Sequence, residues 1–414
     1  MGRMVTLRCP KCANEPDSAI IFSCARCGSI LEVIVEIGHL TRADLEKMFQ
    51  RRDRTIWRWF EFFPLESRGS IVSLGEGCTP LLHATRLGEQ FGFSALYLKN
   101  DTVLPTGSLK DRSNSVGLSK AKELGFSTAT VVSTGNAAAS VAAYSAAAGL
   151  KSVVMVPSGT AHSKIAQARA YGATVILIDG DFDGDVAKLY RAAVREFGWY
   201  DCLSSNPYRD EGKKSYAYEI VEQLNQRAPD WVIHPTAGGT GLYSMWKGYQ
   251  ELLTLGWIER LPRLVAAQSE AAAPIVAAFR KGAADIEPVM ARDTVAESIQ
   301  VGNPISLGWR ALAALRQSNG TAVALTDNEI LEAQFLIGSL AGIFVEPAAA
   351  TSVAAAKKLR TAEMIGQDEI VVCNLTGHGL KQPGAVRFDE KEFRPILPNL
   401  EALRERLKSI NGWN

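Results

Sequence analysis

From about residue 94 onward, short runs of β-branched and other apolar residues alternate with longer stretches that have the composition of helices. In chain order the runs are ATVVS, SVVMVP, ATVILID, WVIHP, LVAAQS and IVVCNLT. Several helical stretches end at a glycine in the position where a left-handed residue is expected, as at Gly125, Gly149 and Gly172. Strands that alternate with helices in this way predict βαβ units and parallel sheets buried on both faces. The pattern therefore predicts an α/β fold, in which ligands gather at the carboxyl ends of strands.

The N-terminal part of the chain has a different pattern. Residues 1–40 contain two Cys-x-x-Cys pairs and then SILEVIVEI, which predicts a strand. Thr41 is placed to cap a helix in TRADLEKMFQRR, with Asp44 in the first turn. The aromatic stretch TIWRWFEFFPL follows, and we expect it to pack this arm onto the main body.

The two Cys-x-x-Cys pairs have the spacing of a metal site. They consist of Cys9, Cys12, Cys24 and Cys27. Each pair supplies two thiolates from one tight turn, which suits tetrahedral zinc, although the spacer of 11 residues is short of the usual range. Disulfides are the alternative, and a reducing cytosol disfavours them. We expect a zinc-ribbon-like element with a structural role, because the segment has little of the basic and aromatic decoration of a nucleic-acid binder.

Composition narrows the class of protein further. The chain has 414 residues, of which 47% are hydrophobic and 21% charged, and its net charge is +1. Such a chain is long enough for two or three domains. The balanced charge argues against a dedicated binder of nucleic acid or of membrane surfaces, and no apolar run approaches the ~18 residues of a membrane span. A cytoplasmic enzyme with a small-molecule substrate is the expectation.

Three strand-to-helix junctions carry residues suited to chemistry. In PTGSLKDRSNS, Lys110 stands where a helix begins, a position at which a lysine is ordinarily only a solvated surface residue. The loop Ser133–Asn136 combines two hydroxyls, an amide and the free N–H groups of a helix start, which together suit an anion. The third loop is glycine-rich and consists of Ala237, Gly238, Gly239, Thr240 and Gly241. Taken alone this loop is a weak signal, because it matches neither the Walker loop nor the dinucleotide fingerprint.

The combination is more specific than its parts. A lysine, an anion cradle and a phosphate loop are what a protein needs to hold pyridoxal phosphate. Lys110 would form the Schiff base, which requires a partly desolvated amine with a lowered pKa. A fourth stretch, NLTGHGLKQP, places the Thr376 hydroxyl where the ring nitrogen of the cofactor needs a partner.

Seven stretches resemble the threonine synthases, which are fold type II pyridoxal-phosphate enzymes. They are SLGEGCTPL, TGSLKDR, STGN, SSNPYRDEGKKS, GNPIS, IFVEPAAATS and LTGHGLK. The resemblance implies two α/β domains with parallel or mixed sheets and the cofactor in the cleft between them. Residues 41–95 and 207–414 would form the large cofactor-binding domain, and residues 96–206 a smaller mobile domain. It also implies a homodimer.

The resemblance assigns roles at the cofactor. Lys110 would bind the cofactor covalently and later act as the mobile acid and base. Asn136 would bond the 3′-oxygen, the Ala237–Gly241 loop would hold the phosphate, and Thr376 would face the pyridine nitrogen as a neutral partner.

The resemblance also implies a lyase reaction and a substrate site. Threonine synthases convert O-phosphohomoserine and water to threonine and phosphate, by γ-elimination followed by addition of water at the β-carbon. Ser133 and Thr134 would receive the substrate carboxylate. Ser204, Arg209 and Lys214 would hold the substrate phosphate, which is the group that leaves.

The chain departs from the family pattern mainly in the substrate site. Leu109 replaces a phenylalanine and the phosphate loop is rich in Gly and Thr instead of Asn, and we expect both changes to be tolerated. Leu203 replaces a polar residue that helps to hold the substrate phosphate, which would weaken its recognition by about 1.5–3 kcal/mol. Gln382 stands where an Asp is common. The cofactor site is therefore intact and the substrate site is altered.

Other functions remain open at this point. A β-replacement on O-phosphoserine, as in cysteate synthase-like enzymes, keeps the cofactor chemistry and changes the substrate. A serine or threonine dehydratase and a non-catalytic ribbon protein with a regulatory pyridoxal pocket are further alternatives. Two further polar residues have simple structural explanations: Glu346 precedes a helix, where an acid favours the helix dipole, and His234 has no metal-ligand spacing and fits a surface or core position.

Overall fold

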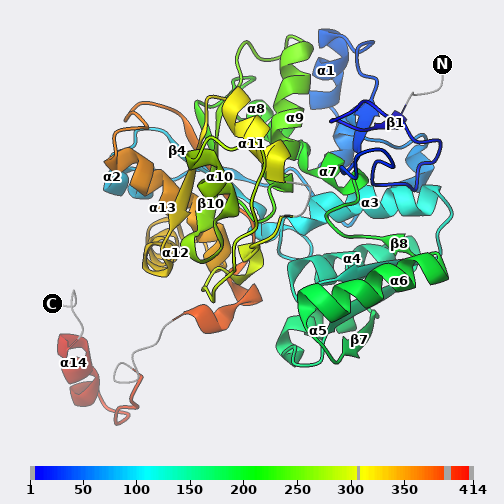
Figure 1. Ribbon diagram of the computed structural model, residues 1–414. Helices are drawn as coiled ribbons and strands as arrows, with labels where there is room; N and C mark the ends of the chain where they lie inside the picture. Colours follow the sequence, from blue (N-terminus) through cyan, green and yellow to red (C-terminus); the bar gives the residue numbers. More distant parts are fainter. Residues whose placement is uncertain (1–4, 305–307, 387–392, 410–414) are drawn as a thin grey trace. The chain divides into compact units, whose positions relative to one another are not determined.

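The computed structural model describes residues 5–304, 308–386 and 393–409, and divides into two compact units, residues 1–381 and 382–414. In its described part the second unit contains the short helix Pro383–Ala385 and α14 (Leu400–Ser409). The first unit contains the sheets and the other helices, which Figure 1 follows from blue to orange. No helix in the described part of the chain is long and apolar enough to cross a membrane.

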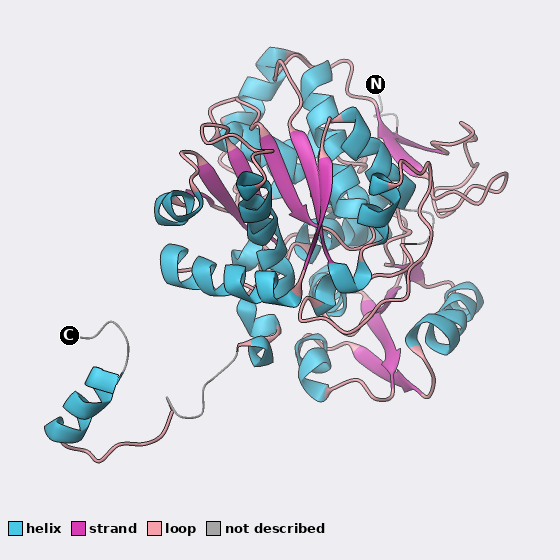
Figure 2. Cartoon of the chain, turned by 60° about the vertical axis from the view of Figure 1, so that its left-hand side comes forward, coloured by secondary structure: helices cyan, strands magenta, loops and turns pink. Residues whose placement is uncertain are grey.

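The larger sheet has six strands in the order β11-β10-β9-β12-β4-β3. Figure 2 shows the strands in magenta with helices packed around them. Their bounds are β3 Leu81–His83, β4 Leu96–Asn100, β9 Trp231–Pro235, β10 Arg263–Ser269, β11 Thr321–Leu325 and β12 Val371–Leu375. All neighbours are parallel except the edge pair β3–β4. Successive residues of β9 enter different cores, Val232 on one face and Ile233 on the other. The prediction of a parallel sheet buried on both faces is thus confirmed.

The smaller sheet has four parallel strands in the order β7-β6-β5-β8. Their bounds are β5 Thr128–Val132, β6 Lys151–Pro157, β7 Thr174–Ile178 and β8 Tyr200–Asp201. The sequence placed residues 96–206 in a smaller domain, but β4, which opens that range, pairs with β12 in the larger sheet. The reason is that Leu96 and Leu98 of β4 are buried in the large core, a contact that local sequence does not reveal.

The described part of the first unit also contains thirteen α-helices. They are α1 Arg42–Phe49, α2 Thr85–Phe91, α3 Lys110–Glu123, α4 Asn136–Ala148, α5 His162–Ala170, α6 Ala187–Phe197, α7 Tyr208–Lys213, α8 Ser215–Gln223, α9 Thr240–Thr254, α10 Pro274–Arg280, α11 Gly308–Gln317, α12 Asp327–Ala341 and α13 Pro347–Thr361. Thr41 and Asp44 form the expected cap of α1. Gly125, Gly149 and Gly172 have the positive φ angles expected after helix ends.

The N-terminal ribbon is a small antiparallel pair, β1 (Val5–Arg8) and β2 (Glu32–Val35), that packs against α7 and α9. Tyr208 of α7 donates its hydroxyl to the carbonyl of Ala19 at 3.0 Å. Tyr243 of α9 donates to the carboxylate of Glu32, and Lys247 of α9 donates to the carbonyl of Val33. The ribbon therefore contacts the two helices that border the site described below.

The aromatic arm lies in the large core, as its composition predicts. Trp57, Trp59, Phe62 and Phe63 are buried and share one apolar cluster with residues of α8, α9 and α11. The indole N–H of Trp57 donates to Glu76 at 3.0 Å.

Helices α3 and α7 meet at two glycines. A Cβ at Gly212 of α7 would collide with the carbonyl of Arg112 in α3. A Cβ at Gly117 of α3 would lie 2.8 Å from Cγ of Arg209 in α7. The two helices can approach this closely only because both positions lack a side chain.

Candidate active site

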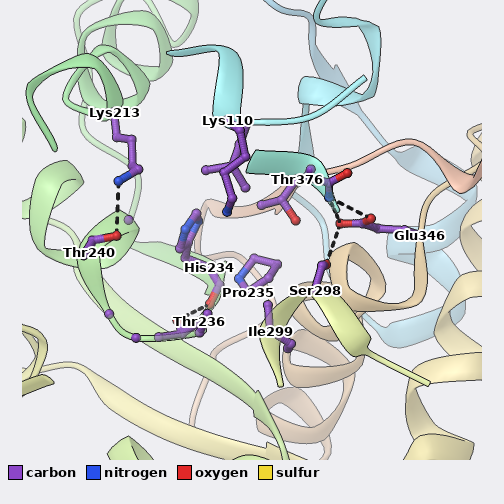
Figure 3. A pocket seen from close by; sticks show the side chains of 16 residues that line it. Lys110, Lys213, His234, Pro235, Thr236, Thr240, Ser298, Ile299, Glu346 and Thr376 are labelled. Atoms are coloured by element: carbon purple, nitrogen blue, oxygen red, sulfur yellow. Dashed lines mark hydrogen bonds between the residues drawn. The ribbon is translucent and has the colours of Figure 1, made fainter. Parts of the chain in front are cut away.

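The turn before α3 fixes the position of Lys110. Gly107 has φ +78°, a left-handed conformation that suits glycine. Asp111, in the first turn of the helix, accepts bonds from the amide and hydroxyl of Thr106 at 2.7 and 2.6 Å. This closed turn starts the helix at Lys110 and directs its side chain into the pocket (Figure 3).

The Lys110 turn is joined to the loop that follows β12. The amide of Leu109 donates to the carbonyl of Thr376 at 2.9 Å. The amide of Glu346, just before α13, donates to the carbonyl of Gly377 at 3.0 Å. Backbone bonds therefore connect three segments that are far apart in the sequence, and they place Lys110, Thr376 and Glu346 around one pocket.

All eight of the predicted cofactor residues line this pocket. The lining residues include Lys110, Asn136, Ala237, Gly238, Gly239, Thr240, Gly241 and Thr376. They come from the start of α3, the start of α4, the loop between β9 and α9, and the residue after β12. All four positions lie at strand ends or helix starts, as expected for an α/β fold.

The glycine-rich loop presents backbone rather than side chains. Gly239 has φ +93° and stands at the N-cap of α9, where no side chain caps the helix. A Cβ at Gly239 would lie 2.6 Å from Cβ of Ala311, and one at Gly241 would collide with the ring of His234. Glycine is therefore required at both positions, and the free N–H groups of the first turn of α9 remain available to an anion.

Lys110 is a half-buried amine with an altered pKa. Burial and the nearby cations Lys213 and Arg209 lower the pKa of Lys110 from 10.5 to about 8. Among the described residues, no hydrogen-bond acceptor contacts its Nζ. The same environment lowers the pKa of the buried His234 to about 3, through burial, Lys110 and Lys213, so that this imidazole is neutral.

These features fit pyridoxal phosphate. The unpartnered amine of Lys110 faces the pocket, the uncapped start of α9 offers N–H groups for a phosphate, and the Thr376 hydroxyl lies on the same pocket wall. Asn136 fits less directly, because its amide donates to both carboxylate oxygens of Glu346 at 3.1 and 3.0 Å. It would have to share or exchange these bonds to reach a cofactor oxygen.

The predicted substrate residues are only partly brought to the pocket. Arg209 is buried in α7, bonds Asn114 at 3.0 Å and acts electrostatically on Lys110. Ser133 and Thr134 are half-buried in the loop before α4, and Ser204 is exposed, but none of the three is in the wall around Lys110.

Lys214 is placed elsewhere, which corrects its assignment to the substrate phosphate. Its Nζ is fully buried and pairs with Glu211 and Glu251, both at 2.7 Å. It also donates to the carbonyl of Phe62 at 2.9 Å. Two carboxylates already neutralise this ammonium, so it holds α7 and α9 together instead of facing a ligand.

Sequence reasoning missed Lys213 in the pocket wall and explained His234 and Glu346 too simply. Lys213 lines the pocket, and its signal was the i, i+4 spacing from Arg209, which puts both cations on one helix face. His234 is buried there as well. Glu346 begins α13 as expected, yet it does not cap that helix through its side chain, and it also accepts a bond from Ser298 at 2.8 Å. The quoted GNPIS stretch extends into residues 305–307, which lie outside the described residues.

The four cysteines of the ribbon gather as predicted. Their sulfur atoms all lie within 4.8 Å of one another, with Cys9–Cys27 and Cys12–Cys24 separations of 3.5 Å. All four are free thiols rather than disulfides. Four thiolates at this spacing are a ligand set that could hold zinc.

Comparison with known proteins gives consistent results. A family model described as pyridoxal-phosphate dependent enzyme matches residues 72–377. The threonine synthase of Methanocaldococcus jannaschii is 42% identical over 97% of this chain and 99% of its own length. That of Methanosarcina acetivorans is 40% identical over 98% of this chain and 99% of its own length.

Solved structures share the fold at lower identity. Diaminopropionate ammonia lyase from Escherichia coli has a TM-score of 0.64 and 17% identity, and the match covers 92% of this chain and 96% of that one. Threonine deaminase isoform 2 from Solanum lycopersicum has a TM-score of 0.62 and 18% identity, covering 81% and 88%. These likenesses concern the fold alone.

Proposed function

The chain belongs to the pyridoxal-phosphate dependent enzyme family and, within it, to the threonine synthases, and we propose that Lys110 binds the cofactor and O-phosphohomoserine is the substrate. One observation carries the proposal. The Lys110 amine has its pKa lowered to about 8 and faces a pocket whose other walls are an uncapped, glycine-rich helix start and the Thr376 hydroxyl.

Lys110 would do most of the proton transfer. When bound, the cofactor supplies an electron sink for negative charge that develops on the carbon atoms of the substrate. Lys110 Nζ would take the proton from the substrate Cα and return protons later in the reaction. With a pKa of about 8, roughly a tenth of this amine is neutral at pH 7, far more than for an ordinary lysine.

Other residues of the chain would orient the substrate and accept its phosphate. Arg209, a buried cation on α7, would bind the phosphate as it leaves, with the exposed Ser204 as a neutral donor. Ser133 and Thr134 would bind the substrate carboxylate at the start of α4. Asn136 would turn from Glu346 toward the 3′-oxygen of the cofactor.

A β-replacement on O-phosphoserine is the second candidate, and Leu203 favours it. Leu203 packs against the apolar clusters beside the smaller sheet, and its amide is bonded to Asp201 at 2.7 Å. The side chain therefore offers no polar group to the longer phosphorylated substrate.

The test is an incubation of purified protein with O-phosphohomoserine and, separately, with O-phosphoserine. Phosphate and amino-acid products are assayed, with Lys110→Ala as the control. Threonine and phosphate from the first substrate alone are expected. Failure to turn over O-phosphohomoserine would contradict the assignment, and lysine-dependent phosphate release from O-phosphoserine would favour the second candidate.

We also propose that the protein works as a cytoplasmic homodimer, and that the segment carrying the smaller sheet closes over the substrate. The free thiols of the ribbon suit a reducing compartment. Light scattering coupled to size exclusion measures the mass in solution, and a monomer would contradict the dimer.

A further inference from the structure

Lys213, the last residue of α7, lies against the first residue of α9. Its Nζ is 3.1 Å from the hydroxyl oxygen of Thr240 and 3.2 Å from Oδ1 of Asp210. Only 5% of Lys213 is exposed, and its side chain lines the pocket of Lys110 (Figure 3).

The positive charge around Lys213 is not balanced by the acids that surround it. Asp210 is shared between Lys213 and Arg310, whose guanidinium is 3.4 Å from its other oxygen. All three side chains are at most 6% exposed. Arg209, equally buried, donates to the neutral side chain of Asn114. Buried charges require partners, so this corner of the pocket has a surplus of positive charge and is suited to an anion.

The surplus faces the glycine-rich loop. Lys213 donates to Thr240, and a hydroxyl that accepts a bond from an ammonium keeps its own proton free to donate elsewhere. Thr240 is also the first residue of α9, whose N-cap Gly239 has no capping side chain. An anion at this loop would therefore meet backbone N–H groups, an oriented hydroxyl and a lysine behind it.

We propose that Lys213 is a positioning residue for the phosphate of pyridoxal phosphate. Its ammonium would orient the Thr240 hydroxyl toward the phosphate and would offset part of the phosphate's negative charge. The inference rests on the proposed function, because it takes the pocket to be the cofactor site. A substrate phosphate is the other source of the same chemistry. The contact with Thr240 favours the cofactor phosphate, because Thr240 belongs to the glycine-rich loop proposed to bind that phosphate. The substrate phosphate is assigned to Arg209 instead.

The test compares a ligand that has the phosphate with one that lacks it. Full-length apoprotein is titrated with pyridoxal phosphate and with pyridoxal, and binding is followed by absorbance. In Lys213→Gln, affinity for pyridoxal phosphate is expected to fall about 10–100-fold, while affinity for pyridoxal changes less than about threefold. The ³¹P resonance of the bound cofactor is expected to titrate at higher pH in this variant, because the phosphate loses a neutralising cation.

Lys120→Gln is the matched control. Lys120 is equally buried at 6% and pairs with Glu123 at i+3, as Lys213 pairs with Asp210 at i−3, but it is outside the pocket wall. This variant should leave both affinities unchanged. Lys213→Arg should recover part of the lost affinity. If Lys213→Gln does not fold, Lys213→Met, which keeps the length of the side chain and removes its charge, provides the test and should show the same selective loss.

The outcomes separate the two proposals. A wild-type protein that binds no pyridoxal phosphate contradicts the proposed function. A wild-type protein that binds it, with equal losses for both ligands in Lys213→Gln, overturns the inference alone. Unchanged cofactor affinity with a raised KM for the phosphorylated substrate also overturns it, by assigning Lys213 to the substrate.

Discussion

The contact between Gly239 and Ala311 allows a quantitative test of the phosphate loop. In Gly239→Ala the alanine would have to keep the backbone angle φ of +93°. Its Cβ would lie 2.6 Å from Cβ of Ala311 and 3.3 Å from Cδ1 of Ile275. The left-handed backbone costs alanine about 1–2 kcal/mol. The distance to Cβ of Ala311 is about 1 Å shorter than a normal carbon–carbon contact, and overpacking of this kind costs about 1–3 kcal/mol. Only the second cost depends on residue 311.

A double-mutant cycle separates the two costs. Ala311→Gly alone places a glycine in α11 and should destabilise the protein by about 1 kcal/mol. In Gly239→Ala/Ala311→Gly the overlap is absent, so a coupling of about 1–3 kcal/mol should be recovered. The four proteins are unfolded in urea and followed by tryptophan fluorescence, and midpoints are compared provided that the slopes agree.

The cycle has a clear refutation. If Gly239→Ala destabilises the protein by less than about 0.5 kcal/mol, the loop can relax and glycine is not required there. If the single variant is destabilised but Ala311→Gly recovers nothing, the cost lies in the backbone alone. The affinity of each variant for pyridoxal phosphate, measured in parallel, tests whether the same geometry serves the ligand.

Three further predictions concern other parts of the first unit. Arg112→Met leaves the buried carboxylates of Asp101 and Glu219 without their guanidinium partner, and should destabilise the protein by about 3–5 kcal/mol; an unchanged urea midpoint would contradict this. The pKa of Lys110 is lowered to about 8, and only the neutral amine attacks an aldehyde. The rate at which apoprotein combines with pyridoxal should therefore rise as the pH passes 8 and level off above it. Stopped-flow absorbance measures this rate, and a rate that still rises up to pH 10 would contradict the prediction. The ribbon should carry about one zinc per chain by elemental analysis, and chelation should lower the thermal midpoint, whereas a Cys9→Ser protein without zinc but with normal stability would show that the metal is dispensable.

Those parts of the fold that depend on local physics could be predicted from the sequence. Glycine can adopt φ angles that other residues avoid, so Gly125, Gly149 and Gly172 mark helix ends before any contact is known. Strand runs that alternate with helices imply parallel sheets, and the carboxyl ends of such strands are where the loops before Lys110, Asn136 and α9 come together. The alternation of strands and helices along the sequence is enough to predict that these loops meet.

The rest depends on contacts between distant residues. Glu346 accepts a hydrogen bond from Asn136, which is 210 positions away in the sequence. The residues next to Glu346 in the sequence therefore suggest only an acid at a helix start. Lys213 and Lys214 are adjacent, and only the start of α7 at Tyr208 decides which of them faces the pocket. Strand β4 has ordinary strand composition, and its sheet is decided by its partner β12.

The close contact of α3 and α7 at Gly117 and Gly212 bears on how this protein can evolve. Lys110 begins one helix, and Arg209 and Lys213 lie on the other, so the spacing of the three cations is fixed by a contact that tolerates no side chain. A substitution that moves one of these cations would have to shift both helices together. The loop before α7, which contains Leu203, does not take part in this glycine contact, so changes of substrate are more accessible there. A library that randomises this loop and keeps both helices unchanged is the most direct way to obtain variants with new substrates.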